Sequence, residues 1–165
     1  MFCAATLKRL LLAGMLGFIL PGCVTTPPLK PGEHEPALSD CPPLPNCAST
    51  EAAASSMHVI PAFELDMPID RAWPIIKETV RDLPGTEILR EDATHHYLYA
   101  KAYSDVLGFV DYFEVLARPL PRADSGAQRL AVRSAAMLGI SDMGVNEART
   151  ERFREMLRDR GVIKP

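Results

Sequence analysis

The chain has 165 residues, of which 47% are hydrophobic, and this length allows one domain of ordinary size with a buried core. Its formal net charge is -3, and its Lys and Arg residues form no basic stripe. An acidic chain without such a stripe argues against a nucleic acid as partner. The sequence contains no glycine-rich nucleotide loop and no H-E-x-x-H zinc motif, so we expect no cofactor and no metal.

Residues 1–22 have the parts of a bacterial lipoprotein signal. Lys8 and Arg9 form a short positive region, and the apolar run at 10–20 is shorter than the about 20 residues that a membrane-spanning helix needs. The run leads into "LPGC", which resembles the lipobox, the motif whose cysteine is lipidated and becomes the first mature residue. We therefore expect Cys23 to anchor the protein in the bacterial cell envelope. By resemblance to sorted lipoproteins, the absence of Asp after Cys23 favours the outer membrane, facing the periplasm. A plain signal peptide or an anchoring helix is the alternative.

The segment 23–56 has a different composition, rich in Pro, Ser, Thr and Ala and poor in large apolar residues. Such a segment buries too little surface to offset its ordering entropy, so its composition predicts a semi-extended linker. It contains Cys41 and Cys47. Because the envelope outside the cytoplasm is oxidising, we expect a disulfide between them. The alternatives are free thiols or half of a metal site completed by His34 or His58.

The folded domain is expected to span residues 57–165. It begins with a strand in "HVIPAFELDM", where apolar residues alternate at every second position. A helix follows in "IDRAWPIIKETVRDLPG", with apolar residues at every third or fourth position. Asp70 is expected as its N-cap, and Pro74 is expected in its first turn, where few amide donors are needed.

Four further strands are predicted at about 86–91, 95–103, 108–117 and 128–137, with turn signals between them. The segment "NEARTERFREMLRDRG" predicts a final helix. The order is therefore strand, helix, four strands, helix. Strands joined by short turns pair antiparallel, so we expect an α+β two-layer sandwich in which two helices cover one face of an antiparallel sheet of about five strands. This order of elements resembles the TATA-binding-protein-like and helix-grip folds.

Three stretches, "CPPLPNCAST", "FVDYFEV" and "VRSAAMLGISDMGVNEAR", together resemble the bacterial family called domain of unknown function 1499. The resemblance covers roughly residues 40–158, and the order of the three motifs is fairly specific. The members of that family are uncharacterised, so the resemblance implies a pattern of residues and no reaction.

The last of these stretches holds most of the polar residues that a site could use. The candidate ligand-binding residues are Arg133, Ser141, Asp142, Asn146 and Arg149. One interpretation is structural: Asp142 and Asn146 cap a glycine-bent connection, and Arg133 pairs with Asp111 or Glu114, which fall on opposite faces of one strand. The other is a polar pocket at the end of the sheet, where the helix N-terminus adds partial positive charge for an anionic group.

The leading hypothesis is a non-enzymatic, lipid-anchored envelope protein. Its domain would bind another envelope component or a small anionic or lipidic ligand. The alternative is a hydrolase or transferase that acts on an envelope lipid or glycan through the polar loop 133–149. A nucleophile at Ser141 would need a histidine base, and nothing in the sequence places His95 or His96 beside it. No catalytic residue is therefore assigned.

Overall fold

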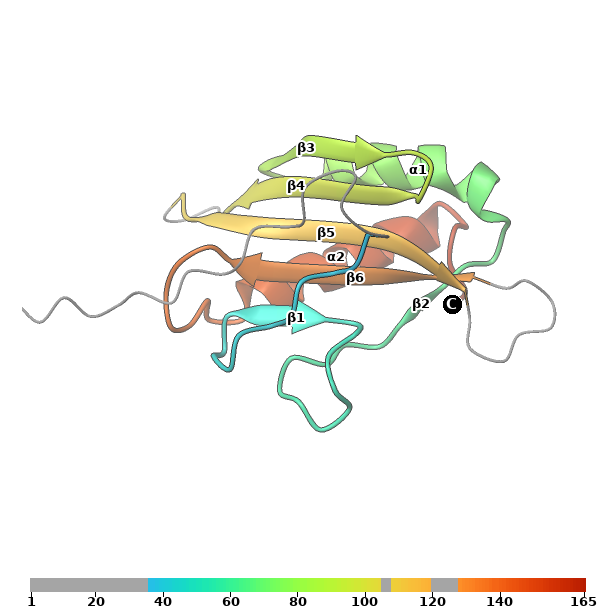
Figure 1. The fold of residues 1–165 in the computed structure, drawn as a ribbon. Helices are drawn as coiled ribbons and strands as arrows, with labels where there is room; N and C mark the ends of the chain where they lie inside the picture. Colours follow the sequence, from blue (N-terminus) through green and yellow to red (C-terminus); the bar gives the residue numbers. More distant parts are fainter. Residues whose placement is uncertain (1–35, 105–107, 120–127) are drawn as a thin grey trace, which may run out of the picture.

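The computed structural model describes residues 36–104, 108–119 and 128–165 (Figure 1). The predicted signal peptide and Cys23 lie outside the described residues. The elements in chain order are β1 (Cys47–Ser49), β2 (Phe63–Glu64), α1 (Ile69–Asp82), β3 (Thr86–Asp92), β4 (Tyr97–Tyr103), β5 (Val110–Pro119), β6 (Gln128–Ala136) and α2 (Val145–Asp159). The α+β sandwich is confirmed, with a sheet of six strands instead of about five.

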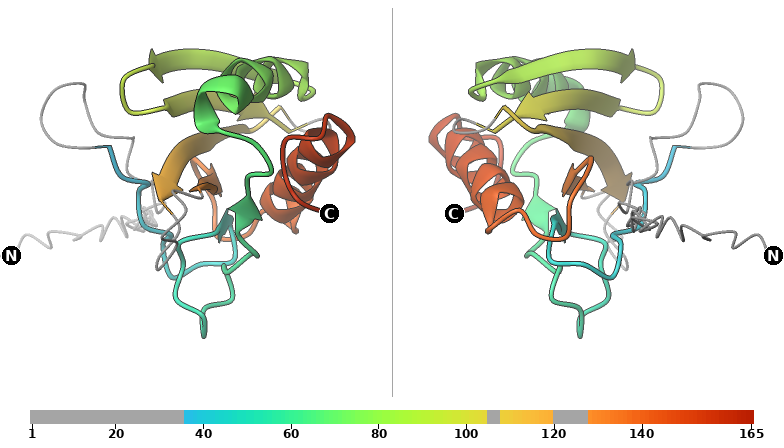
Figure 2. Two further views of the ribbon diagram at one scale, coloured as in Figure 1. Left: turned by 90° about the vertical axis from the view of Figure 1, so that its right-hand side faces the viewer. Right: turned by 90° about the vertical axis from the view of Figure 1, so that its left-hand side faces the viewer.

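The sheet has the order β1-β6-β5-β4-β3, and β2 also pairs with β6. All of these pairs are antiparallel. Tyr103 faces Val110, and Asp111 faces Ala136, so the end of β4, the start of β5 and the end of β6 meet. We call this the motif end of the sheet, because the polar connection 137–144 leaves from it toward α2. Both helices lie on one face of the sheet, and the chain that enters at residue 36 lies on the other (Figure 2).

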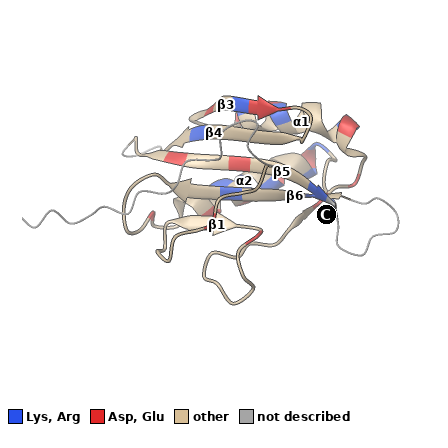
Figure 3. Cartoon of the chain, in the orientation of Figure 1, with Lys and Arg blue, Asp and Glu red and all other residues tan. Residues whose placement is uncertain are grey.

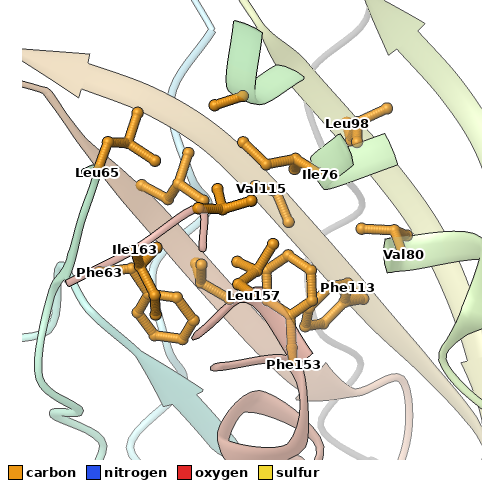
Figure 4. Packing of buried hydrophobic residues seen from close by; sticks show 14 of the residues in the cluster. Phe63, Leu65, Ile76, Val80, Leu98, Phe113, Val115, Phe153, Leu157 and Ile163 are labelled. Carbon is orange, nitrogen blue, oxygen red and sulfur yellow. The ribbon is translucent and has the colours of Figure 1, made fainter. Parts of the chain in front are cut away.

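The main core fills the space between the sheet and the two helices (Figure 4). Because side chains alternate along a strand, Phe113 and Val115 of β5 point to the helix face. There they pack with Ile76 of α1 and Phe153 of α2, and the rings of Phe113 and Phe153 meet edge to face with centroids 5.3 Å apart. Each such fully buried side chain stabilises the fold by about 1.5–3 kcal/mol. This core holds α2, and with it the motif residues, against the sheet.

Helix α1 begins differently from the sequence prediction. Its N-cap is Pro68, and Asp70 lies in the first turn without capping the helix through its side chain. The carbonyl of Pro68 accepts the first backbone N–H bonds, from Arg71 and Ala72. Pro74 lies inside the helix and not in its first turn, and its missing N–H removes one backbone bond. The helix tolerates this loss because its buried face, which includes Ile76, is fixed by the core.

The folded part begins earlier in the chain than residue 57, where the sequence analysis predicted its start. Residues 46–50, within the predicted linker 23–56, are buried, and β1 pairs with β6 from Cys47 to Ser49. The pairing supplies backbone hydrogen bonds that local composition does not reveal. Conversely, the strand predicted in "HVIPAFELDM" is reduced to β2 and two isolated bridges, one between Val59 and Ser49 and one between Leu65 and Ile163.

Candidate functional site

The connection from β6 to α2 is organised by the carboxylate of Asp142. Its Oδ1 accepts the N–H of Gly144 at 3.0 Å, and its Oδ2 accepts the backbone N–H of Asn146 at 2.9 Å and its side-chain Nδ2 at 2.6 Å. Gly144, with φ of 82°, is the N-cap residue of α2, so Asn146 lies inside the helix and does not cap it as predicted. Asp142 supplies the negative charge that a helix N-terminus favours. An outside anion would therefore have to compete with the chain's own carboxylate.

Arg149 joins α2 to the sheet. Its Nη2 donates to Asp111 Oδ2 of β5 at 2.7 Å, and its Nη1 donates to Ser134 Oγ of β6 at 3.0 Å and to Asn146 Oδ1 at 2.7 Å. The hydroxyl of Ser134 also donates to Asn146 Oδ1. The side chain of Arg149 is 9% exposed and that of Asp111 is 4% exposed, so this is a buried ion pair with polar neighbours. The network binds the helix to two strands at the motif end.

The segment before β1 completes the same network. The carbonyl of Pro45 accepts the N–H of Asp142, and the carbonyl of Asn46 accepts Nδ2 of Asn146 at 3.2 Å. In return, Nδ2 of Asn46 donates to the carbonyl of Gly139 at 2.7 Å. The three sequence motifs quoted above, which lie far apart in the chain, thus meet at one place.

A second buried pair lies on the opposite face of the sheet. Arg133 Nη1 donates to Glu114 Oε2 at 2.7 Å, and both side chains are 0% exposed. The Tyr97 hydroxyl donates to Glu114 Oε1 at 3.0 Å, and the carbonyl of Asp40 accepts from Arg133 Nη2 at 3.2 Å. In the strand register Glu114 of β5 faces Arg133 of β6, and Figure 3 shows acidic residues on β5 and basic residues on β6. Arg133 therefore does not join the other candidate residues, because it points away from α2.

A disulfide between Cys41 and Cys47 closes the chain over this second pair. Cys47 belongs to β1, so the bond ties the segment at 36–41 to the sheet edge. Within that segment the backbone N–H of Ser39 donates to Glu114, and Leu38 packs on a small cluster with Tyr97. The predicted disulfide is confirmed, and the two sulfurs are therefore not free thiolates for a metal.

Both buried carboxyls have perturbed pKa values. Burial raises the pKa of Asp111, and Arg149 opposes the rise. Burial likewise raises the pKa of Glu114, opposed by the charge of Arg133 and by the Tyr97 hydroxyl. Desolvation disfavours the charged form of any buried acid, and here it outweighs the attraction of the facing guanidinium groups.

A pocket of about 660 Å³ opens at the motif end, between the segment that follows α1, the strand ends and α2. Its apolar walls come from the end of α1, the start of β5, the connection after β6 and the exposed side of α2. These wall residues are Leu83, Phe109, Ala136, Leu138, Met143, Val145 and Ala148. Of the predicted site residues, Ser141, Asp142 and Arg149 line the pocket, whereas Arg133 and Asn146 do not.

The sequence prediction missed the apolar wall and concentrated on the polar residues. A signal was present in "LGISDMGV", where Leu138, Ile140, Met143 and Val145 alternate with turn residues in a connection that cannot bury them all. All four are more than one-third exposed, with Met143 at 95%. The pocket itself was not predictable, because its lining comes from five separate parts of the chain, including Tyr103 and Ser104 at the end of β4.

The geometry gives the enzymatic alternative little support. Ser141 follows the motif end of the sheet, whereas His95 and His96 precede Tyr97, at the opposite end of β4. The Ser141 hydroxyl accepts the N–H of Met143 at 3.2 Å. Within residues 36–104, 108–119 and 128–165, no three His, Cys, Asp or Glu residues come together as metal ligands.

In the same parts of the chain, no helix has the length and apolar character that crossing a membrane requires.

These observations define a small two-layer α+β domain with a largely apolar pocket at one end and a buried polar network beside it. The chain belongs to the family described as Protein of unknown function (DUF1499), whose model matches residues 37–157. The matched range covers the three motifs that meet at the motif end. Comparison with curated proteins finds no match.

Proposed function

We propose that this protein is a lipid-anchored component of the bacterial envelope, and that its domain binds a small apolar or amphipathic molecule without transforming it. The anchor would be a lipid on Cys23, for which the "LPGC" motif is the support. The disulfide between Cys41 and Cys47 agrees with an oxidising compartment outside the cytoplasm. The proposed location is the periplasmic side of the outer membrane.

The pocket at the motif end is the observation that carries the proposal. Its volume of about 660 Å³ falls within the range of about 300–1,000 Å³ that is typical of small-molecule sites. Such sites combine mostly apolar walls with a few placed polar groups, and here Asp111 and Arg149 are those groups. Because they neutralise each other at 2.7 Å, the interior favours an apolar ligand portion over an isolated charge.

A binding role without catalysis is favoured by how the polar residues are used. Asp142 holds the start of α2, Arg149 holds Asp111, and Asn146 bridges to Ser134. A catalytic acid, base or nucleophile needs a group that can exchange a proton with substrate. Here the side chains are occupied in supporting the pocket wall.

Filling the pocket tests this proposal. Ala148 is exposed on α2 and lines the pocket, so Ala148→Trp should occupy the cavity without disturbing the core. The probe is dansyl-labelled undecanoic acid, titrated into a non-lipidated form of the chain that begins at Val24. We expect saturable enhancement of dansyl emission with the unchanged sequence and with the control Glu155→Trp, an exposed change elsewhere on α2. We expect no enhancement with Ala148→Trp, and equal emission in all three would contradict the proposal.

The anchor is tested separately by mass spectrometry of the mature N-terminus. A protein that begins at Cys23 and carries three acyl chains is the expected product, and Cys23→Ser should leave the precursor uncleaved. An unmodified N-terminus at Met1 in the envelope fraction would contradict the anchor but not the pocket.

A further inference from the structure

Large apolar side chains around the mouth of the pocket are exposed to solvent. Phe109 is 62% exposed, Leu138 55%, Ile140 70% and Met143 95%. Phe109, Leu138 and Met143 line the pocket, and Ile140 lies between two residues that do. We call these four residues the mouth patch. Isolated exposed apolar residues are ordinary on a protein surface, but a contiguous group of this kind marks an interaction site.

The charges around the mouth patch suit a lipid surface. The pocket lining contains two acidic residues, Asp111 and Asp142, and two basic residues, Arg149 and Arg152, so it carries no net charge although the whole chain is at -3. Three of the four are used internally, as described above. Arg152 is exposed, and among the described residues its guanidinium group has no ion-pair or hydrogen-bond partner. An unpaired Arg beside exposed Phe, Leu, Ile and Met side chains is the composition that favours an interface between water and lipid.

The proposed anchor would keep a membrane within reach of this surface. Cys23 precedes Pro36, the first described residue, by only 13 positions, which span at most about 45 Å even when fully extended. A tether of that length holds the domain at a high effective concentration next to the bilayer. Because the anchor would already hold the domain at the bilayer, the side chains of the mouth patch would only have to orient it there.

We infer that the mouth patch docks onto the bilayer, so that the pocket opens into the lipid interface and not into water. This inference rests on the proposed anchor and goes beyond the proposed ligand. A molecule with an acyl chain would then enter the pocket from the membrane without exposing its chain to water. Leu138, Ile140 and Met143 contact the acyl region, and Arg152 meets the phosphate of a lipid headgroup.

Quenching by brominated lipid tests the docking. The mature protein, from which the signal peptide has been removed, is purified from membranes. It is reconstituted into vesicles of phosphatidylethanolamine and phosphatidylglycerol whose acyl chains are brominated. Met143→Trp places a reporter in the mouth patch. Met57→Trp is the matched control, because Met57 is a methionine that is 76% exposed but does not line the pocket. The buried Trp73, the only native tryptophan, supplies a constant background.

The indole introduced by Met143→Trp should lose most of its emission in brominated vesicles, whereas the indole introduced by Met57→Trp should keep its emission. Equal quenching of the two variants, or quenching of neither, overturns the docking. If neither is quenched while Ala148→Trp still abolishes binding of the dansyl probe in solution, the docking is wrong and the pocket stands. Protein that does not float with the vesicles overturns both the anchor and the docking.

Discussion

Glu114 and Arg133 form an ion pair from which solvent is completely excluded, with 2.7 Å between Oε2 and Nη1. The pair lies on the face of the sheet away from the helices, beneath the segment at 36–41. Breaking a buried pair leaves one charge uncompensated, so Glu114→Ala or Arg133→Ala should lower the free energy of unfolding by about 3–5 kcal/mol. Chemical denaturation measures this. The double variant Glu114→Leu with Arg133→Met, of similar volume, should recover much of the loss. A single-variant cost below about 1 kcal/mol, typical of exposed pairs, would contradict the burial.

The disulfide should hold the segment at 36–41 over that pair. Replacing Cys41 and Cys47 by Ala together should cost about 2–3 kcal/mol on the chain-entropy estimate. The amide of Ser39, which donates to Glu114, should exchange with solvent much faster, while amides of α2 stay protected. Hydrogen exchange followed by mass spectrometry measures the exchange at Ser39 and in α2, and chemical denaturation measures the loss of stability. An unchanged rate at Ser39 would mean that the segment is held by Leu38 and the carbonyl of Asp40 without the disulfide.

The side chain of Asp142 should contribute more to the stability of the fold than that of its neighbour Ser141. Asp142→Ala removes the acceptor of three hydrogen bonds, to Gly144 N and to the backbone and side-chain nitrogens of Asn146, and should cost about 1–2 kcal/mol. Ser141→Ala removes one acceptor for the N–H of Met143 and should stay within about 0.5 kcal/mol of the original protein. Thermal unfolding followed by circular dichroism compares them. Equal shifts in Tm would show that Asp142 does not organise the start of α2.

The raised pKa of Asp111 gives a signed pH dependence. A carboxyl whose pKa is higher in the folded state binds its proton more tightly there than in the unfolded chain. Its contribution to the free energy of unfolding is therefore greatest below the ordinary carboxyl pKa and decreases as pH rises through the raised value. Asp111→Asn does not titrate, so the stability of the original protein relative to this variant should fall from pH 4 to pH 7. Denaturation across that pH range measures the difference, and a rise would show that Arg149 dominates and lowers the pKa.

Local periodicity was sufficient to predict most of the regular structure. Strands β3 to β6 and both helices lie close to the predicted ranges, because alternation along a strand and three-to-four spacing along a helix depend only on nearby residues. The same alternation separates Asp111 from Glu114, which lie on opposite faces, so each required its own partner. The structure assigns Arg149 to the first and Arg133 to the second.

Features that depend on distant contacts were not predictable. Strand β1 lies in a Pro-, Ser- and Ala-rich segment and exists because β6 and the disulfide hold it. Asn46 joins the site from the same segment, 93 positions before Gly139, to which it donates. The pocket escapes prediction for the same reason, since the segment after α1, the end of β4, the start of β5, the connection after β6 and α2 each supply one part of its lining.

The central claim is that the pocket holds an apolar or amphipathic molecule, and native mass spectrometry of the protein purified from its own membranes tests it most directly. The account predicts that the original protein and Glu155→Trp carry a bound species of lipid mass, released on gentle activation, and that Ala148→Trp carries none. Bare protein masses for all three, or the same bound species on Ala148→Trp as on the other two, would contradict it.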